Sequence, residues 1–317
     1  MIERTVVVTD HRWPDLEIER QALAEVRGTV RAVETDGELQ SLLEKADAVL
    51  NGFVPLTAAL IARMENCRVI CRWGIGVDNI DLEAATRAGI QVANVPDYCV
   101  EEVSTHVIAL ILAANRKLFG LYDQSRSGGW GFAAIRPVHR LGRQVLGLLG
   151  YGQIGRAVAR KATALGMTVL CHDPYAPGDE AARSVDLETL LRDSDYVSLH
   201  LPLSEETRGL LDAKRFSLMK PESFLINAAR GEVIDVDALA AALRKRRIQG
   251  AYLDVLPEEP PPSDHPLLSA GAVLTGHSAW YSEEALADLR AKAVRQIVLA
   301  LSGKPVEYPV NQPRAGR

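Results

Sequence analysis

The fold of this chain is decided by the sequence VLGLLGYGQIGRAVA at residues 145–159. It carries the pattern G-x-G-x-x-G, directly after an apolar strand-like run and at the start of an alanine-rich helical run. A second strand-like run, Thr168 to Cys171, follows and leads to Asp173. A strand, a helix and a strand around such a glycine pattern indicate a dinucleotide-binding βαβ unit.

Each glycine of this pattern has a physical reason. Gly150 allows the tight turn, Gly152 lets the backbone approach a pyrophosphate, and Gly155 lets helix and strand pack closely. The start of the helix offers N–H groups and a positive dipole end to the phosphates. Asp173 lies about 20 residues on, where a carboxylate binds ribose hydroxyls and repels a 2′-phosphate. We therefore expect NAD rather than NADP, although His172 and Arg183 leave NADP open.

Strand-like and helix-like runs alternate on both sides of this unit, which is typical of α/β proteins. Val100 to Leu118 predicts one long, mostly buried helix, and residues 120–144 are polar and irregular in pattern. Glu283 to Leu301 has helical spacing and follows the last strand-like run. Its apolar face needs a partner, and the first domain is a candidate. Both chain ends are then expected to form one domain, with the middle of the chain as the other.

Length and composition limit the classes of protein. The chain has 317 residues, about two domains' worth, and it is 47% hydrophobic with a net charge of −5. An acidic balance disfavours a nucleic-acid surface, and the basic run at 244–247 is expected to end a helix. No run is apolar enough to cross a bilayer, and no signal peptide is evident. Four scattered cysteines predict reduced thiols rather than a disulfide or metal site. We expect a cytoplasmic protein without a membrane or nucleic-acid partner and without a metal.

Reduction of a carbonyl by a nicotinamide cofactor requires a proton donor, a cation and a carboxylate anchor. His277 follows a strand-like run, at the edge where α/β sheets bind ligands, and His200 is an alternative donor. Arg230 also ends a strand, with a structural ion pair as its alternative role. Glu258 and Glu259 lie in a proline-rich loop, which is expected to be stiff. A stiff loop can hold a carboxylate against an imidazole. The alternative is that this loop is only a solvated acidic loop.

The chain resembles a known family, the D-isomer-specific 2-hydroxyacid dehydrogenases. The resemblance runs from about Arg72 to Leu301 and is carried by GIGVDNID at 74–81, the glycine pattern at 150–155, NAARG at 227–231, Glu259-Pro260 and His277. It implies that Arg230 polarises the substrate carbonyl, that His277 is the general acid/base, and that Glu259 pairs with it. The backbone N–H groups of Gly76 and Val77 would bind the substrate carboxylate. The implied cofactor contacts are Gln153, Ile154, Asp173, Pro202, Thr207, Ala228, Ala229, Arg230 and Asp254.

One segment departs from the family pattern. Most members have a proline before the histidine, whereas this chain has Gly276 there and continues as HSAWYS at 277–282. That stretch looks like the C-terminal-binding-protein branch, which implies that Trp280 and Arg72 line the substrate pocket. Arg72 in a surface ion pair and Trp280 as core filler are the alternatives. This branch also raises a second function, an NAD(H)-sensing interaction protein with little turnover, and a third, an enzyme for an unusual acid.

The alternation and the resemblance together predict an α/β fold with two doubly wound parallel-sheet domains. A Rossmann nucleotide domain, residues 100–283, is expected to be inserted into a flavodoxin-like substrate domain, residues 1–99 plus 284–317. The active site would lie in the cleft between them. The substrate would be a 2-hydroxy or 2-keto acid whose identity the sequence does not choose. The family also implies a homodimer formed through the helix after Val100 and the loop at 121–144.

Overall fold

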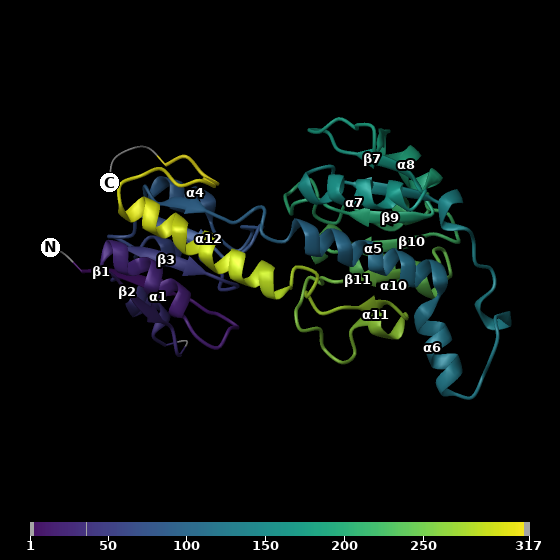
Figure 1. Ribbon diagram of the computed structural model, residues 1–317, viewed down its shortest axis with the longest axis horizontal. Helices are drawn as coiled ribbons and strands as arrows, with labels where there is room; N and C mark the ends of the chain where they lie inside the picture. The colour runs from purple at the N-terminus through teal and green to yellow at the C-terminus, as the bar shows by residue number, and fades with distance from the viewer. Residues whose placement is uncertain (1–2, 36, 314–317) are drawn as a thin grey trace. The chain divides into compact units, whose positions relative to one another are not determined.

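The computed structural model describes residues 3–35 and 37–313. The chain forms two compact units: unit 1 comprises Met1–Tyr98 and Ser282–Arg317, and unit 2 comprises Cys99–Tyr281. Each unit is built on an all-parallel β-sheet, of five strands in unit 1 and seven in unit 2 (Figure 1). The predicted fold class, one doubly wound unit inserted into another, is confirmed.

Unit 1 contains one sheet and its covering helices. Its elements are β1 (Arg4–Val8), α1 (Glu17–Leu23), the 3₁₀ turn η1 (Ala24–Val26), β2 (Gly28–Ala32), α2 (Leu39–Leu43), β3 (Ala48–Asn51), α3 (Ala58–Ile61), β4 (Val69–Arg72), α4 (Leu82–Arg87), β5 (Gln91–Ala93) and α12 (Glu283–Leu301). The strand order is β2-β1-β3-β4-β5, the flavodoxin-like order. The inner strands β1, β3 and β4 are runs of buried Val, Ile, Leu, Ala and Cys, as expected for parallel strands covered on both faces.

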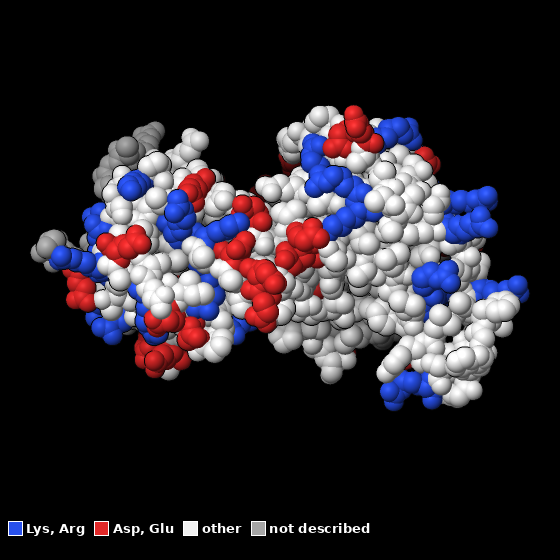
Figure 2. All heavy atoms as spheres, viewed as in Figure 1, with Lys and Arg blue, Asp and Glu red and all other residues white. Residues whose placement is uncertain are grey.

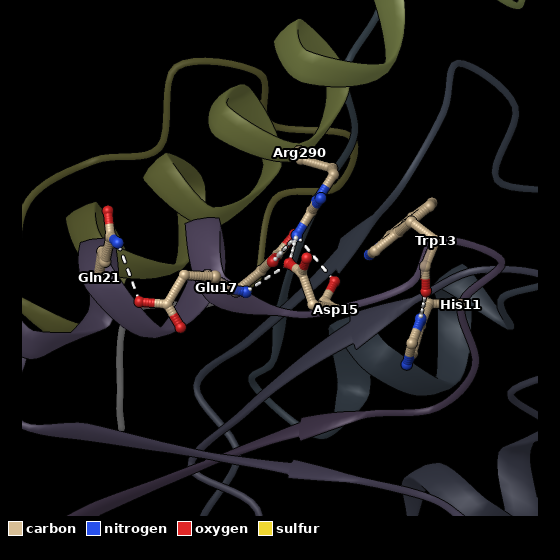
Figure 3. A network of polar contacts seen from close by, with 7 residues as sticks. His11, Trp13, Asp15, Glu17, Gln21 and Arg290 are labelled. Atoms are coloured by element: carbon tan, nitrogen blue, oxygen red, sulfur yellow. Dashed lines mark hydrogen bonds and ion pairs between the residues drawn. The ribbon is translucent and has the colours of Figure 1, made fainter. Parts of the chain in front are cut away.

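A buried ion pair joins the two ends of the chain within unit 1. Arg290 on α12 donates from Nε and Nη2 to the two carboxylate oxygens of Glu19 on α1, at 3.0 and 2.8 Å. Glu19 is completely buried, and Arg290 also donates to the carbonyl of Asp15 and lies over the ring of Trp13 (Figure 3). Because removing either partner would leave a buried charge uncompensated, this pair fixes α12 against α1.

Unit 2 carries the glycine-rich stretch. Its elements are α5 (Val100–Arg116), α6 (Leu118–Arg126), η2 (Ala133–Ile135), η3 (Leu141–Arg143), β6 (Val145–Leu149), α7 (Gln153–Ala164), β7 (Thr168–His172), β8 (Arg183–Ser184), α8 (Leu187–Asp193), β9 (Tyr196–Leu199), α9 (Ala213–Phe216), β10 (Phe224–Asn227), η4 (Gly231–Val233), α10 (Val236–Arg244), β11 (Gly250–Leu253), α11 (Pro266–Ser269) and β12 (Val273–Leu274). The strand order is β12-β11-β10-β9-β6-β7-β8. The chain leaves β6 toward β7 on one side and reaches β9 on the other. The carboxyl end of β6 is therefore a topological switch point, where such sheets bind ligands.

The structure corrects several predicted elements. The helix expected over 100–118 ends at Arg116, because Lys117 adopts a left-handed φ of +52°. The stretch expected to be irregular then begins with a second helix, α6. The run from Leu56 to Met64 has helical spacing in the sequence, but only Ala58–Ile61 of it forms a helix, α3. The elements β2 and α2 were not predicted, since β2 is a partly exposed edge strand without an apolar run and α2 is only five residues long.

Charge is mixed over the surface of unit 1. On the face of this unit seen in Figure 2, basic and acidic side chains are interspersed. In unit 2 the basic run at 244–247 begins at the last residue of α10, and two of its arginines contact their own unit: Arg244 donates to Ser269 and Arg247 to the carbonyl of Ser217. Across residues 3–35 and 37–313, none of the helices combines the length and apolarity that a membrane span requires.

Candidate active site

Most of the candidate site residues predicted from the sequence lie just after the carboxyl ends of the strands in unit 2. Because all these strands are parallel, the segments that follow them emerge at one edge of the sheet. In spatial order from β12 to β7, these segments carry His277, Asp254, the stretch 228–230, the loop 202–207, the glycine turn 150–155 and Asp173. Residues far apart in the sequence are thus brought to a common edge.

The glycine turn between β6 and α7 leaves no room for side chains at two of its positions. Gly150 has a φ of +95°, and a Cβ there would lie 2.4 Å from the carbonyl oxygen of His200. A Cβ at Gly155 would lie 2.5 Å from the carbonyl oxygen of Gly150. At Gly152, by contrast, a Cβ would meet no atom within 4 Å. The turn is therefore tightly packed at Gly150 and Gly155 and leaves open space at Gly152, in front of the first turn of α7. A pyrophosphate group requires such open space at the start of a helix.

Asp173 lies beside this glycine turn, directly after β7. Its Oδ2 accepts a hydrogen bond from the backbone N–H of Tyr151 at 2.7 Å, and its Oδ1 accepts from Tyr175 N at 2.8 Å. Arg156 on α7 lies over the Tyr151 ring and pairs with Asp179 at 2.7 Å. The carboxylate is thus fixed beside the glycine turn, and the nearby arginine is engaged with another carboxylate.

Two further segments surround the same edge. After β9, Thr207 closes a small loop by donating from Oγ1 to the carbonyl of Pro202 at 2.7 Å. After β10, buried Asn227 donates to the carbonyl of Arg230 at 2.8 Å and accepts from Ala229 N at 2.9 Å. These bonds fix the backbone from Ala228 to Arg230. The next residue, Gly231, ends the NAARG motif, and a Cβ there would lie 2.1 Å from the backbone of Leu256.

His277 and Glu259 form the most directly paired groups at this edge. Nδ1 of His277 lies 2.7 Å from Oε2 of Glu259, and Oε1 of Glu259 accepts from Leu256 N at 2.8 Å. Burial by itself raises the pKa of Glu259. The hydrogen bonds from His277 and Leu256, with the positive charges of His277 and Arg230, outweigh that effect and leave the pKa of Glu259 below its ordinary value. Glu259 therefore remains a carboxylate at neutral pH.

Asp254 holds the turn that carries His277. Its carboxylate accepts hydrogen bonds from Thr275 Oγ1 at 2.6 Å and from the backbone N–H groups of Ser278 and Ala279, both at 3.0 Å. The carbonyl of Asp254 accepts from His277 N at 2.6 Å. His277 has a φ of +54°, which is unusual for a residue with a side chain and costs energy. The hydrogen bonds that Asp254 accepts offset that cost and fix the backbone that carries the imidazole.

Two residues of this network were not predicted from the sequence. Nε2 of His106, on α5, lies 3.1 Å from Thr275 Oγ1 and 3.8 Å from Asp254 Oδ1. The second residue is Thr275, which donates to Asp254. The sequence gives only a weak signal for this contact, because both residues follow strand-like runs. His106 gives none, because it lies 169 residues away from Thr275 in a helix that otherwise has the pattern of core.

The alternative proton donor, His200, is in a different situation. Its Nε2 lies 3.0 Å from Oγ of Ser198, and its carbonyl lies under the glycine turn. Loss of hydration lowers the pKa of His200 to about 4. An imidazole with this pKa is neutral at physiological pH, so the structure disfavours His200 as the donor.

Arg72 and the glycines after it lie in unit 1, at the carboxyl end of β4. Gly74 has a φ of +141°, and a Cβ there would lie 1.4 Å from Nη1 of Arg72. The guanidinium of Arg72 therefore crosses the backbone of the turn that leads to Gly76 and Val77. The turn is held by Asn94, which donates to the carbonyl of Ile75 at 2.6 Å.

Trp280 lies in unit 2, three residues after His277. It is half-buried and meets Tyr281 edge to face, with the ring centroids 5.6 Å apart.

The geometry at the carboxyl edge of unit 2 defines a class of protein: a Rossmann unit with a nucleotide turn, and an imidazole–carboxylate pair beside an arginine, are the parts of a nicotinamide-dependent dehydrogenase.

The family follows from comparison with known proteins. The chain belongs to the D-isomer specific 2-hydroxyacid dehydrogenases: the model of that family's NAD-binding domain matches residues 108–279. This is a family of NAD(P)-dependent oxidoreductases, and the fit of unit 2 to the cofactor rests on the open glycine turn and on Asp173.

Three relatives illustrate the similarity. D-3-phosphoglycerate dehydrogenase of Methanocaldococcus jannaschii is 37% identical over 88% of this chain and 54% of its own length. Glycerate dehydrogenase of Methylorubrum extorquens is 34% identical over 86% of this chain and 88% of its own. The structure of D-lactate dehydrogenase from Aquifex aeolicus with NAD and lactic acid matches with a TM-score of 0.89, at 28% identity over 97% of this chain and 99% of that one. The chain thus spans about half the length of the first relative and most of the other two.

Proposed function

We propose that this protein transfers a hydride between NAD(H) and C2 of a D-2-hydroxy acid or its 2-keto acid. The observation that carries the proposal is the pairing of His277 with Glu259 beside Arg230, at the edge that also holds the glycine turn. The cofactor supplies the hydride when bound. The side chains of this protein must then move one proton, polarise one carbonyl and bind one carboxylate.

His277 is assigned the proton transfer. Nδ1 pairs with Glu259, and we assign to Nε2 the donation of a proton to the carbonyl oxygen during reduction and its acceptance during oxidation. The carboxylate of Glu259 fixes the orientation of the imidazole. Since the pKa of Glu259 is lowered, its charge is retained as the pH falls below the ordinary value for glutamate and is lost only on further acidification.

Arg230 and the turn in unit 1 are assigned the substrate. Arg230 places a cation on the carbonyl oxygen, where negative charge develops during hydride transfer. Arg72, with the backbone N–H groups of Gly76 and Val77, binds the substrate carboxylate, and Trp280 limits the size of the substrate side chain. The support is the packing of Arg72 on Gly74, which fixes the guanidinium at this turn.

A panel of 2-keto acids tests the proposal, each incubated with NADH or NADPH and followed by the absorbance of the reduced nicotinamide. We expect turnover with at least one small 2-keto acid, and a preference for NADH because Asp173 repels a 2′-phosphate. Tight NADH binding without turnover of any keto acid would contradict the proposal. That result would instead support an NAD(H)-sensing interaction protein of the C-terminal-binding-protein type, which the resemblance at 276–282 keeps as the second candidate.

The protein is also proposed to be a homodimer that uses the segment around α6. This segment extends away from the body of unit 2 (Figure 1) and exposes large apolar side chains. Their exposed fractions are 50% for Leu118, 46% for Phe119, 58% for Tyr122, 94% for Trp130 and 67% for Phe132. Such a patch is typical of an interface. Sedimentation at micromolar concentration should give twice the mass of the chain, and a monomer would contradict the proposal.

The cytoplasmic location stays a prediction.

A further inference from the structure

Three loops meet at the carboxyl edge of the sheet in unit 1. Strand β3 lies between β1 and β4, with Val8 opposite Leu50 and Asn51 opposite Arg72. The segments that follow these strands therefore emerge side by side. They carry Arg12 after β1, Phe53 after β3 and Arg72 at the end of β4.

The ring of Phe53 holds two guanidinium groups. The guanidinium carbon of Arg12 lies 4.4 Å from the ring centroid, and that of Arg72 lies 5.7 Å from the same centroid. Both distances are within the range of a cation–π contact. The two cations are thus no farther apart than the sum of these distances, and Phe53, which is 44% exposed, presents them at the surface of unit 1.

The loop that carries Phe53 is held in place by Asp10. Its carboxylate accepts from Gly52 N at 3.0 Å and from Phe53 N at 2.7 Å. The hydroxyl of Thr9 donates to the same carboxylate at 2.6 Å. On the other side, Asn79 donates to the carbonyl of Gly52 at 3.0 Å. The charge of Asp10, the carboxylate nearest to Arg12 in the sequence, is therefore engaged with backbone and hydroxyl donors.

The other neighbour of Arg12 is anchored as well. Trp13 packs edge to face on Trp73, with the ring centroids 4.6 Å apart, and Arg290 lies over it at 5.5 Å. Figure 3 shows Trp13 beside Arg290 at the start of the segment that leads to α1. Because Asp10 and Trp13 are both fixed, the backbone at Arg12 is held on both sides. Its side chain is exposed and, among the described residues, makes no ion pair.

We propose that Arg12, held on Phe53 beside Arg72, binds a second anionic group of a 2-keto acid substrate, namely a carboxylate, sulfonate or phosphate ester beyond C2. The inference rests on the proposed function, in which Arg72 binds the C1 carboxylate. Two guanidinium groups held close together repel each other, and an anion placed between them relieves that repulsion. Arginine suits this role because its planar fork binds the oxygens of such groups in pairs. The protein then selects dianionic keto acids over monoanionic ones of similar size.

Pairs of keto acids that differ in the second charge test this inference. Suitable pairs are oxaloacetate with 2-oxobutyrate, 3-sulfopyruvate with pyruvate, and 3-phosphohydroxypyruvate with hydroxypyruvate. We expect kcat/KM to favour the keto acid with the second anionic group in at least one pair by about 10- to 100-fold. Arg12→Met keeps the apolar stem over Phe53 and removes the charge. It should lower that preference by a similar factor, mainly by raising KM for the dianion.

The matched control is Arg31→Met, which removes an exposed arginine from β2 and should leave the preference as it is. Added salt should raise KM of the preferred dianion more steeply in the wild type than in Arg12→Met, because screening weakens the contact that the variant has lost. Equal efficiency within every pair, or an equal loss for both members in Arg12→Met, would overturn the inference and leave the proposed function intact. Failure to turn over any keto acid would remove the proposed function and this inference with it.

Discussion

Replacing His277 with asparagine is expected to lower kcat by about 10²- to 10⁴-fold, the usual contribution of a positioned general acid or base. The imidazole is held with Nδ1 2.7 Å from Oε2 of Glu259, and the backbone of His277 has a left-handed φ. The ring is therefore fixed in one orientation at this edge. Asparagine also tolerates a positive φ, which leaves the turn intact. NADH should bind to the variant as before, because the glycine turn and Asp173 are unchanged.

The measurement is kcat with the best keto acid from the panel, together with the dissociation constant of NADH from fluorescence titration. His139→Asn is the matched control, since His139 is exposed and is not among the residues at the catalytic edge. Activity within a few-fold of the wild type in His277→Asn would show that another group moves the proton. Loss of NADH binding in the same variant would point to a structural role for His277 instead.

Replacing Arg230 with alanine is expected to lower kcat by about 10²- to 10³-fold, the cost of removing one preorganised donor from a developing oxyanion. The backbone of Arg230 is fixed through Asn227, so the loss should come from the missing guanidinium rather than from a displaced loop. Arg230→Lys should restore only part of the activity, because an ammonium group keeps the charge but loses the planar fork.

Two readouts separate the roles of Arg230. A lower kcat with unchanged NADH affinity supports polarisation of the carbonyl, and a raised KM for the keto acid adds a contact with its carboxylate. Arg215→Ala, which removes an arginine paired with Asp212 on α9, serves as the control and should retain activity. Near-normal turnover of the true substrate by Arg230→Ala would make the assigned role wrong.

The nucleotide turn is the part of the site that the sequence predicts best. The spacing of Gly150, Gly152 and Gly155 is a short pattern in the sequence. The structure gives a steric reason for Gly150, against the carbonyl of His200, and for Gly155, against the carbonyl of Gly150, while Gly152 leaves the turn open. The structure has Asp173 beside the turn, because a strand, a helix and a strand have nearly fixed lengths, and its contact with a ribose stays a prediction. Local spacing is enough where the geometry is local.

The pairing of Glu259 rather than Glu258 with His277 was predicted only through the family resemblance. Both carboxylates lie in the same proline-rich loop, and composition does not distinguish them. The structure shows Glu259 in contact with His277 and gives the physical reason, since its second oxygen is held by Leu256 N. The support of His277 by Asp254 and His106 was not predicted, because it joins a strand end to a distant helix.

The sequence by itself determined the class of fold and the nucleotide turn, because these depend on short-range periodicity and on glycine sterics. The insertion of one unit into the other was predicted from the apolar face of residues 283–301 and from the family resemblance. Only the tertiary structure decided which side chains share a sheet edge. It placed Arg12 and Arg72 on the ring of Phe53, joined Arg290 to Glu19, and lowered the pKa of His200 by removing its ring from water. These relations depend on strand order and burial, and residues that are neighbours in a parallel sheet are distant along the chain.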